Sequence, residues 1–285
     1  MMPSPSQAER PAGTEIVPRL SYADYVARPG VRASDLMAID RSTPGGAEYH
    51  RTHAADTAAM RLGSALHCMV LEPDRFASEY TLGGPVNANT GQPYGSETKA
   101  FKEWSLAQTK PILTRDEHRI IVGMAESIAA HPVARTIRDT PRQTELSIFW
   151  TLDDGTKCKA RIDCLQDGTI WDVKTCRDAG YRGFERSVAE YRYHMQAAWY
   201  LDGAGRAGLA QRGCRFLWLA VENAPPYQLC VYQCASDLLQ IGHDANERAL
   251  ETLAKCDREK TWPTAYAQEV VMMAAPGWMM PNRPG

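Results

Sequence analysis

The chain has 285 residues, of which 44% are hydrophobic and 23% charged, as in an ordinary globular protein with a buried core. Its 32 basic and 34 acidic residues give a formal net charge of -2, which excludes a nucleic-acid binder that works by bulk positive charge but not one with a local basic groove. The longest apolar runs are too short to span a membrane, and the N-terminus lacks the apolar stretch of a signal peptide, so we expect a cytoplasmic protein without a membrane anchor.

Eight cysteines are too few for a disulfide scaffold of this length, and we expect free thiols in a reducing compartment. No Cys-x-x-Cys motif occurs. Cys230 and Cys234 lie closest together, in a segment that alternates like a strand and would place both thiols on one face. Two readings stay open for this pair: a zinc or iron–sulfur site, and two small buried side chains.

The first half of the chain is predicted to be helical. Residues 1–14 carry three prolines and are expected to form a disordered tail. Residues 83–97 are rich in Gly, Pro and Asn without periodicity, which indicates a long polar loop of the kind that is often functional. The helices are expected over 34–39 with Ser34 as the cap, over 56–71, over about 98–109, and over 114–130 with a Thr114–Glu117 capping box.

Hydrophobic residues then change to a spacing of two, which predicts strands over 144–152, 157–165 and 169–175. Asp154-Gly155 and Asp167-Gly168 separate them as hairpin turns, so these strands should form an antiparallel meander. The rest should add a helix, two strands and a helix, over 184–201, 213–222, 227–234 and 236–255. We therefore expect an α/β (mixed α+β) fold in which helices flank a central mixed sheet, with one domain over 15–260 and an irregular tail over 261–285.

Charged residues on two neighbouring strands are the first candidate site. Asp172 and Lys174 are two residues apart and point to one face, and Asp163 lies on the adjacent strand across a tight turn. Burying these charges is costly without compensation, and Mg²⁺ bound by the carboxylates and the Val173 carbonyl would supply it. Lys174 would orient or deprotonate the attacking water and steady the charge on phosphorus. Taken alone, Asp-x-Lys is also a common surface pair.

Two helical pairs accompany these strands. Gly63 and His67 share one helix face, and the mid-helix glycine indicates that another group approaches closely. Gln196 and Tyr200 share a face of the helix after the third strand. Each pair taken alone is equally compatible with plain packing, so the signal lies in the order of Gly-x-x-x-His, Arg-Ile-Asp, Asp-x-Lys-Thr and Gln-x-x-x-Tyr.

This ordered set resembles the RecB-type branch of the PD-(D/E)xK nuclease superfamily, and most closely its RecE-type exonucleases (exonuclease VIII and PDDEXK-like phage or prophage proteins). The resemblance runs from about residue 20 to 235. Two positions depart from the family pattern: Ile162 stands in place of the proline, and the second acid is Asp172 rather than Glu. The resemblance implies a restriction-endonuclease-like core. The implied roles are metal ligands at His67, Asp163, Asp172 and the Val173 carbonyl, the catalytic lysine at Lys174, and supporting or DNA-binding residues at Glu145, Arg161, Thr175, Gln196 and Tyr200.

The resemblance also implies an activity and partners. It predicts an Mg²⁺-dependent exonuclease, with Mn²⁺ able to substitute and no iron–sulfur cluster, that degrades linear duplex DNA from 5′ to 3′ and leaves 3′ single strands for recombination. Double-stranded DNA ends, an annealing protein of RecT type and a tetramer of this chain would be its partners. Three alternatives remain open: an inactive DNA-binding module of the same fold, a RecB- or Cas4-like nuclease of different polarity, and a thiol hydrolase using Cys68 or Cys164.

Overall fold

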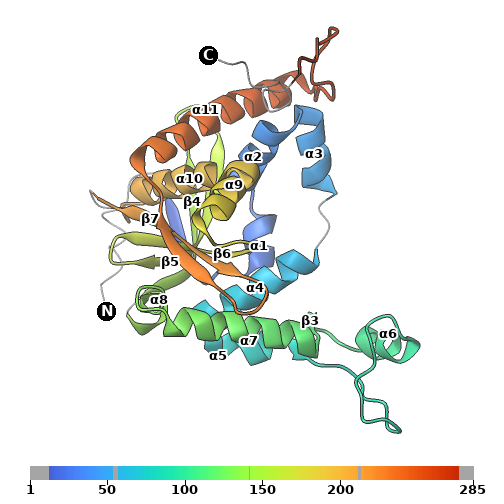
Figure 1. The fold of residues 1–285 in the computed structure, drawn as a ribbon. Coiled ribbons are helices and arrows are strands. Elements are labelled where there is room, and N and C mark those ends of the chain that lie inside the picture. The colour runs from blue at the N-terminus through green and yellow to red at the C-terminus, as the bar shows by residue number, and fades with distance from the viewer. Residues whose placement is uncertain (1–12, 54–56, 141, 211–212, 276–285) are drawn as a thin grey trace, which may run out of the picture.

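The structure is a computed structural model that describes residues 13–53, 57–140, 142–210 and 213–275, and its centre is a mixed sheet between two layers of helices (Figure 1). Strands of the described chain pair in the order β1-β4-β5-β6-β7-β8. Within this six-stranded sheet β6 and β7 run parallel, and the other neighbours are antiparallel. The strands are β1 (Glu15–Pro18), β4 (Gln143–Thr151), β5 (Lys157–Gln166), β6 (Thr169–Cys176), β7 (Arg215–Glu222) and β8 (Leu229–Gln233). This architecture confirms the predicted α/β fold with a mixed sheet flanked by helices.

The predicted meander is formed by β4, β5 and β6. Its second turn places both Asp167 (φ 45°) and Gly168 (φ 67°) in the left-handed region, the backbone that a two-residue hairpin of matching twist requires. Parallel pairing of β6 with β7 needs a crossover, and the two helices between these strands supply it.

One face of the sheet packs against α10, and α11 packs in turn on α10 and α2; Figure 1 shows these helices above the sheet. We call this apolar layer the α10-side core; Leu146, Trp199 and Trp218 belong to it. The helices on this side are α2 (Ala33–Arg41), α3 (Pro44–Thr52), α9 (Tyr181–Tyr191), α10 (Tyr193–Arg206) and α11 (Ser236–Glu259).

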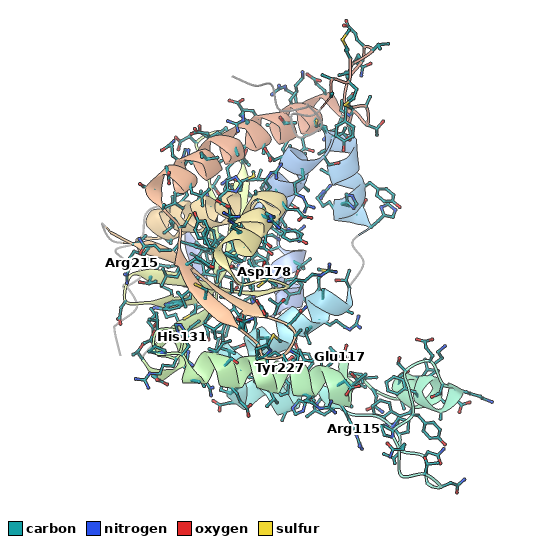
Figure 2. The ribbon with its side chains drawn as sticks, in the orientation of Figure 1. Arg115, Glu117, His131, Asp178, Arg215 and Tyr227 are labelled. Atoms are coloured by element: carbon teal, nitrogen blue, oxygen red, sulfur yellow. The ribbon has the colours of Figure 1, made fainter. Side chains whose placement is uncertain are left out.

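The opposite face packs against α4 and α7, which Figure 1 shows below the sheet. Leu66, Ile121 and Leu219 belong to this second layer, the α7-side core. Tyr227 lies against α7, and a Cβ on Gly123 would fall 2.1 Å from the Tyr227 ring, so the glycine permits this contact (Figure 2). The helices on this side are α4 (Ala58–Leu71), α5 (Pro73–Glu79), α7 (Arg115–Ala130) and α8 (Thr136–Asp139).

A projecting arm separates α5 from α7. The short strands β2 (Thr81–Leu82) and β3 (Ile112–Leu113) pair in parallel, and the chain between them, with α6 (Lys99–Leu106), extends away from the sheet (Figure 1). The polar loop predicted over 83–97 forms its outer part. The predicted Thr114–Glu117 capping box is present at the start of α7.

The structure differs from the sequence prediction at several elements, and helices α3, α5 and α8 and strands β1, β2 and β3 were not predicted. Helix α2 begins before Ser34, because the Asp35 side chain accepts the backbone N–H of Arg32 and closes a capping box there. The helix expected over 184–201 is two helices, since Arg192 adopts a left-handed conformation (φ 60°) between them. The short helix α1 (Tyr22–Ala27) was not expected.

The structure describes only part of each predicted tail. Residues 1–12 and 276–285 are not among the described residues. The described part of the C-terminal segment, 261–275, has no helix or strand, and Pro263 accepts a hydrogen bond from the Gly45 backbone at 2.8 Å. Within the described ranges, no helix combines the length and the apolar character needed to cross a membrane.

Candidate active site

The predicted site lies where β5 and β6 separate. Their ladder pairs Gln166 with Thr169 and ends at Cys164 and Trp171, so Asp163 and Asp172 stand at the base of a fork between the strands. In place of a backbone partner, the Asp163 carboxylate accepts the Val173 N–H at 3.0 Å. The fork explains how two carboxylates occupy a sheet interior: Asp172 is 1% exposed and Asp163 9% exposed.

Glu145, on β4 beside this fork, has a strained backbone. Its φ of 51° lies in the left-handed region, where non-glycine residues of a strand rarely stand. The side chains of β5 also stop alternating regularly between the two faces of the sheet here. Ile162 packs in the α10-side core, but Cys164, two residues later, packs in the α7-side core. The dislocation turns Asp163 into the fork instead of into either core.

Helix α4 carries His67 to the same point. Its Nε2 lies 2.7 Å from the Val173 carbonyl oxygen and its Nδ1 lies 3.4 Å from Asp163 Oδ2. Gly63, one turn earlier, faces Thr175, but an added Cβ would lie 3.8 Å from the Thr175 hydroxyl, an ordinary contact. The close approach inferred from this glycine is therefore absent, and the helix leaves room beside β6.

Asp172 and Lys174 share one face of β6 as the strand period requires, and Lys174 Nζ lies 2.6 Å from Asp172 Oδ2. The ammonium also lies 4.8 Å from the ring centroid of Tyr193, the first residue of α10. The sequence prediction did not single out Tyr193, because one continuous helix was expected over 184–201 and the break at Arg192 that starts α10 at Tyr193 appears only in the structure.

The charged side chains at the fork shift one another's pKa values. Burial raises the pKa of Asp163 to about 6, with His67 opposing the shift and Asp172 adding to it. Burial lowers the pKa of His67, yet the Asp163 and Glu145 carboxylates outweigh it and leave that pKa above its ordinary value. For Lys174, burial likewise lowers the pKa, but the Asp172 and Asp163 carboxylates raise it overall, so the side chain is an ammonium.

The donor set at the fork fits a divalent cation. Asp172 Oδ1 is buried without a hydrogen-bond partner among the described residues, an arrangement that is costly unless a cation or water completes it. The Val173 carbonyl oxygen and Asp163 Oδ2 each lie within 3.4 Å of a His67 ring nitrogen. Carboxylate and carbonyl oxygens suit Mg²⁺ or Mn²⁺, and the imidazole suits Mn²⁺ better.

The predicted pair on α10 lies beside the fork. Gln196 Nε2 donates to the Tyr200 hydroxyl at 3.1 Å. Burial raises the pKa of Tyr200 well above its ordinary value, and Asp163 and Asp172 are among the charges that contribute.

Arg161 and Lys159 stabilise the fold around the site. Arg161 Nε donates to Glu145 at 2.6 Å and its NH1 group to the Leu20 carbonyl at 2.5 Å. The Lys159 ammonium donates to the carbonyls of Tyr25, Val26 and Arg28 at the end of α1. These cations hold the N-terminal segment against β5, so Lys159 is occupied inside the fold and is not available as a DNA contact.

The other candidate centres fit less well. Burial raises the pKa of Cys68 to about 11 and that of Cys164 to about 12, which leaves both thiols protonated and disfavours a thiol nucleophile. Every described cysteine is free, and Cys234 packs in the α10-side core. Among the described residues, the one His/Cys/Asp/Glu group whose ligand atoms all lie within 4.8 Å of one another is exposed on α11 and consists of His243, Asp244 and Glu247; the side chains of the fork are spaced more widely.

The same fold occurs in known proteins. A family model described as a PDDEXK-like domain of unknown function (DUF3799) matches residues 38–272. The crystal structure of a "putative exonuclease" from Eubacterium rectale is similar, with a TM-score of 0.58 at 15% identity over 90% of this chain and 96% of that chain. The crystal structure of SSO0001 has a TM-score of 0.33 at 11% identity over 79% of this chain and 81% of that chain, a TM-score too low to indicate a shared fold. No curated protein matches the sequence. Because the matched family model spans most of the chain, this protein belongs to the PDDEXK-like family and has the fold of the PD-(D/E)xK nuclease superfamily.

Proposed function

We propose that this protein is a divalent-metal-dependent nuclease that hydrolyses phosphodiester bonds of linear duplex DNA. The observation that supports it best is the fork itself: a buried carboxylate with one unsatisfied oxygen at Asp172, beside Lys174 and a converging His67, Asp163 and Val173 carbonyl. Membership of the PDDEXK-like family and the likeness to the exonuclease from Eubacterium rectale support the same activity.

Each side chain at the fork has a role in that reaction. His67, Asp163, Asp172 and the Val173 carbonyl would hold Mg²⁺ or Mn²⁺. When bound, the metal supplies charge to a phosphoryl oxygen and lowers the pKa of a water. Lys174, fixed by Asp172 on one side and the Tyr193 ring on the other, points its ammonium at the reaction centre, where it orients the water and stabilises the charge that develops on phosphorus.

The finer properties follow the RecE resemblance. We propose exonucleolytic digestion from 5′ to 3′ that leaves 3′ single strands for recombination, Mg²⁺ as the natural metal, action as a tetramer on DNA ends, and delivery of the product to an annealing protein of RecT type in the cytoplasm. Glu145, Arg161, Thr175, Gln196 and Tyr200 would support the metal ligands or the DNA path.

The decisive experiment compares the digestion of linear and closed circular duplexes in Mg²⁺, in Mn²⁺ and with a chelator. One batch of the linear duplex is labelled at a 5′ end and another at a 3′ end. The proposal predicts metal-dependent loss of linear DNA and persistence of the circle. Release of the 5′ label first supports the RecE-like polarity, and release of the 3′ label first supports the RecB-like alternative. Cleavage that survives the chelator would overturn the metal-dependent mechanism.

Paired variants separate catalysis from folding. Asp172→Asn should abolish cleavage and, by calorimetric titration, Mn²⁺ binding, because it removes charge from the most buried proposed ligand. Asp202→Asn, on the outer part of α10 in an exposed pair with Arg206, is the matched control and should behave like the wild type. If the wild type binds DNA and metal yet leaves every substrate intact, the protein is an inactive DNA-binding module.

A further inference from the structure

A hollow with three arginines lies outside the fork, at the C-terminal end of α7. Figure 2 labels His131, which ends that helix and whose ring accepts the N–H groups of Val133 and Ala134. The hollow encloses about 200 Å³. Its lining residues are Pro73, Ala129, Arg135, Arg138, Asp139 and Arg142.

The hollow carries uncompensated positive charge. Asp139 supplies its single carboxylate against three guanidinium groups, and this carboxylate lies 4.0 Å from Arg135 Nε, at the outer limit of an ion pair. Among the described residues, neither Arg138 nor Arg142 has a carboxylate partner. Three guanidinium groups facing one concave surface without matching acids favour an anion, and arginine matches the geometry of phosphate in particular.

Arg142 is held in place before any ligand arrives. Its NH1 group donates to the Arg138 carbonyl at 2.6 Å and its NH2 group to the Leu71 carbonyl at 3.4 Å, while its Nε is buried without a hydrogen-bond partner in the described chain. A buried donor without a partner is costly and calls for an acceptor. This Nε is closed off from solvent, so an anion in the hollow would be held by the charge of the fixed guanidinium, which would lose little freedom on binding it.

The position of the hollow connects it with the fork. Arg142 directly precedes β4, three residues before Glu145, a span of roughly 10 Å at the rise of a strand. Leu71, whose carbonyl holds Arg142, is one helical turn beyond His67 on α4. The charge of Arg142 also reaches Cys164, the neighbour of Asp163. The hollow is thus joined to the fork through the first residues of β4 and the last turn of α4.

We propose that this hollow binds a phosphate group of the DNA backbone, a few nucleotides from the phosphodiester that is cut. The inference rests on the proposed nuclease function and adds a second contact that holds the DNA in register. Arg135 and Arg138 supply exposed charge that attracts the phosphate, and Arg142 supplies the fixed donor at the base of the hollow.

The test measures equilibrium binding of a duplex across a salt series, with Asp172→Asn present in every protein so that the DNA stays intact. The logarithm of the DNA-binding constant falls with the logarithm of the salt concentration. Each lost phosphate contact reduces the magnitude of this slope by about 0.9 for duplex DNA. The double variant Arg135→Gln/Arg138→Gln should lower the slope by about one to two units and weaken binding about tenfold at moderate salt. Both side chains are exposed, so the variant should fold; its circular dichroism and unfolding temperature are checked.

Arg248→Gln/Arg258→Gln, with both residues exposed on α11, is the matched loss of two positive charges outside the hollow and should leave the slope unchanged. An equal slope for the hollow variant and this control would overturn the proposal. A second arm adds inorganic phosphate: if phosphate raises the unfolding temperature of the parent protein but not of the hollow variant, while the DNA slopes stay equal, the hollow is a free-anion site and the DNA assignment is wrong.

The experiments distinguish failure of the nuclease proposal from failure of the phosphate-site proposal. A wild-type protein that does not cut DNA, combined with a slope that falls only in the hollow variant, would leave the phosphate site supported and the catalytic role rejected. A wild-type protein that cuts DNA, combined with equal slopes, would do the reverse.

Discussion

At the scale of single residues, the structure restricts the chemical roles that Lys174 can have. Its ammonium is fixed between Asp172 and the Tyr193 ring, and its raised pKa keeps it charged. In the metal-free protein it therefore serves as a cation and not as a proton acceptor.

We expect Lys174→Ala to lower kcat by roughly 10²–10⁴-fold with little change in KM, because the charge is needed in the transition state and less in the ground state. Lys174→Arg should not restore the rate, since the planar guanidinium is larger and differently directed. Single-turnover cleavage alongside equilibrium DNA binding checks this. A variant that binds weakly but cuts normally at saturating DNA would make Lys174 a phosphate contact only.

Tyr193 offers a second prediction, as a positioning residue for Lys174. A cation over an aromatic ring gains about 0.5–2 kcal/mol. Tyr193→Leu should therefore lower kcat about tenfold while Tyr193→Phe, which keeps the ring, stays near the wild type. The Mn²⁺ titration midpoint should not move in either variant. Equal losses in Phe and Leu would instead assign the role to the hydroxyl group.

At the scale of elements, α10 and α11 pack with their backbones in close contact at Gly242. A Cβ there would stand 2.3 Å from the carbonyl oxygen of His194, which cannot move without shifting α10. Gly242→Ala should destabilise the protein by about 1–3 kcal/mol. Gly205→Ala is the matched control: it lies in α10 with open space around it and should be neutral or stabilise by up to about 1 kcal/mol. Urea unfolding of both variants distinguishes packing from helix propensity, and equal midpoints would contradict the close contact.

The start of α10 also makes stability depend on pH. Burial lowers the pKa of His194, and Arg192 adds to this, against the Val188 carbonyl and Asp40, which raise it. The unfolded chain keeps the ordinary value near 6.5, so just below that pH it binds more protons than the folded protein. Stability from His194 is therefore fully present above about pH 6.5 and declines as the pH falls toward the folded value. His194→Gln should flatten the decline in unfolding free energy between about pH 7 and pH 5; an unchanged slope would show that other groups cause it.

At the scale of the whole molecule, the fork joins three parts of the chain: α4, the β5–β6 pair and the start of α10. A metal that binds only the folded protein stabilises it by about 2.7 kcal/mol at a hundredfold excess over Kd. Saturating Mn²⁺ should thus raise the unfolding temperature of the wild type, and a chelator should lower it again with the fold intact. Asp172→Asn should abolish the shift. A shift of equal size in this variant would place the metal elsewhere, with the exposed His243 group on α11 as the first site to examine.

The sequence by itself determined the features that depend on local periodicity and local chemistry. Spacing of two and two Asp-Gly turns predicted the meander, and an apolar helical repeat with a capping box predicted α7. The placement of Asp172 and Lys174 on one face followed from the strand period alone. The ordered set of motifs pointed to the PD-(D/E)xK superfamily before any contact was known, because those residue types are chemically required and widely spaced.

Only the tertiary structure decided how these parts meet. Strand alternation cannot reveal the dislocation at Glu145, because it depends on where β5 leaves β6 and on the Val173 N–H that Asp163 takes up. Nor does Lys159 differ from a surface lysine in sequence; its burial results from α1 folding back over β5, where the Lys159 ammonium donates to the Tyr25 carbonyl 134 residues away along the chain. The arginine hollow likewise needs α5, α7 and α8 side by side, with the end of α4 holding Arg142. Long-range packing sets such contacts, and no local pattern encodes them.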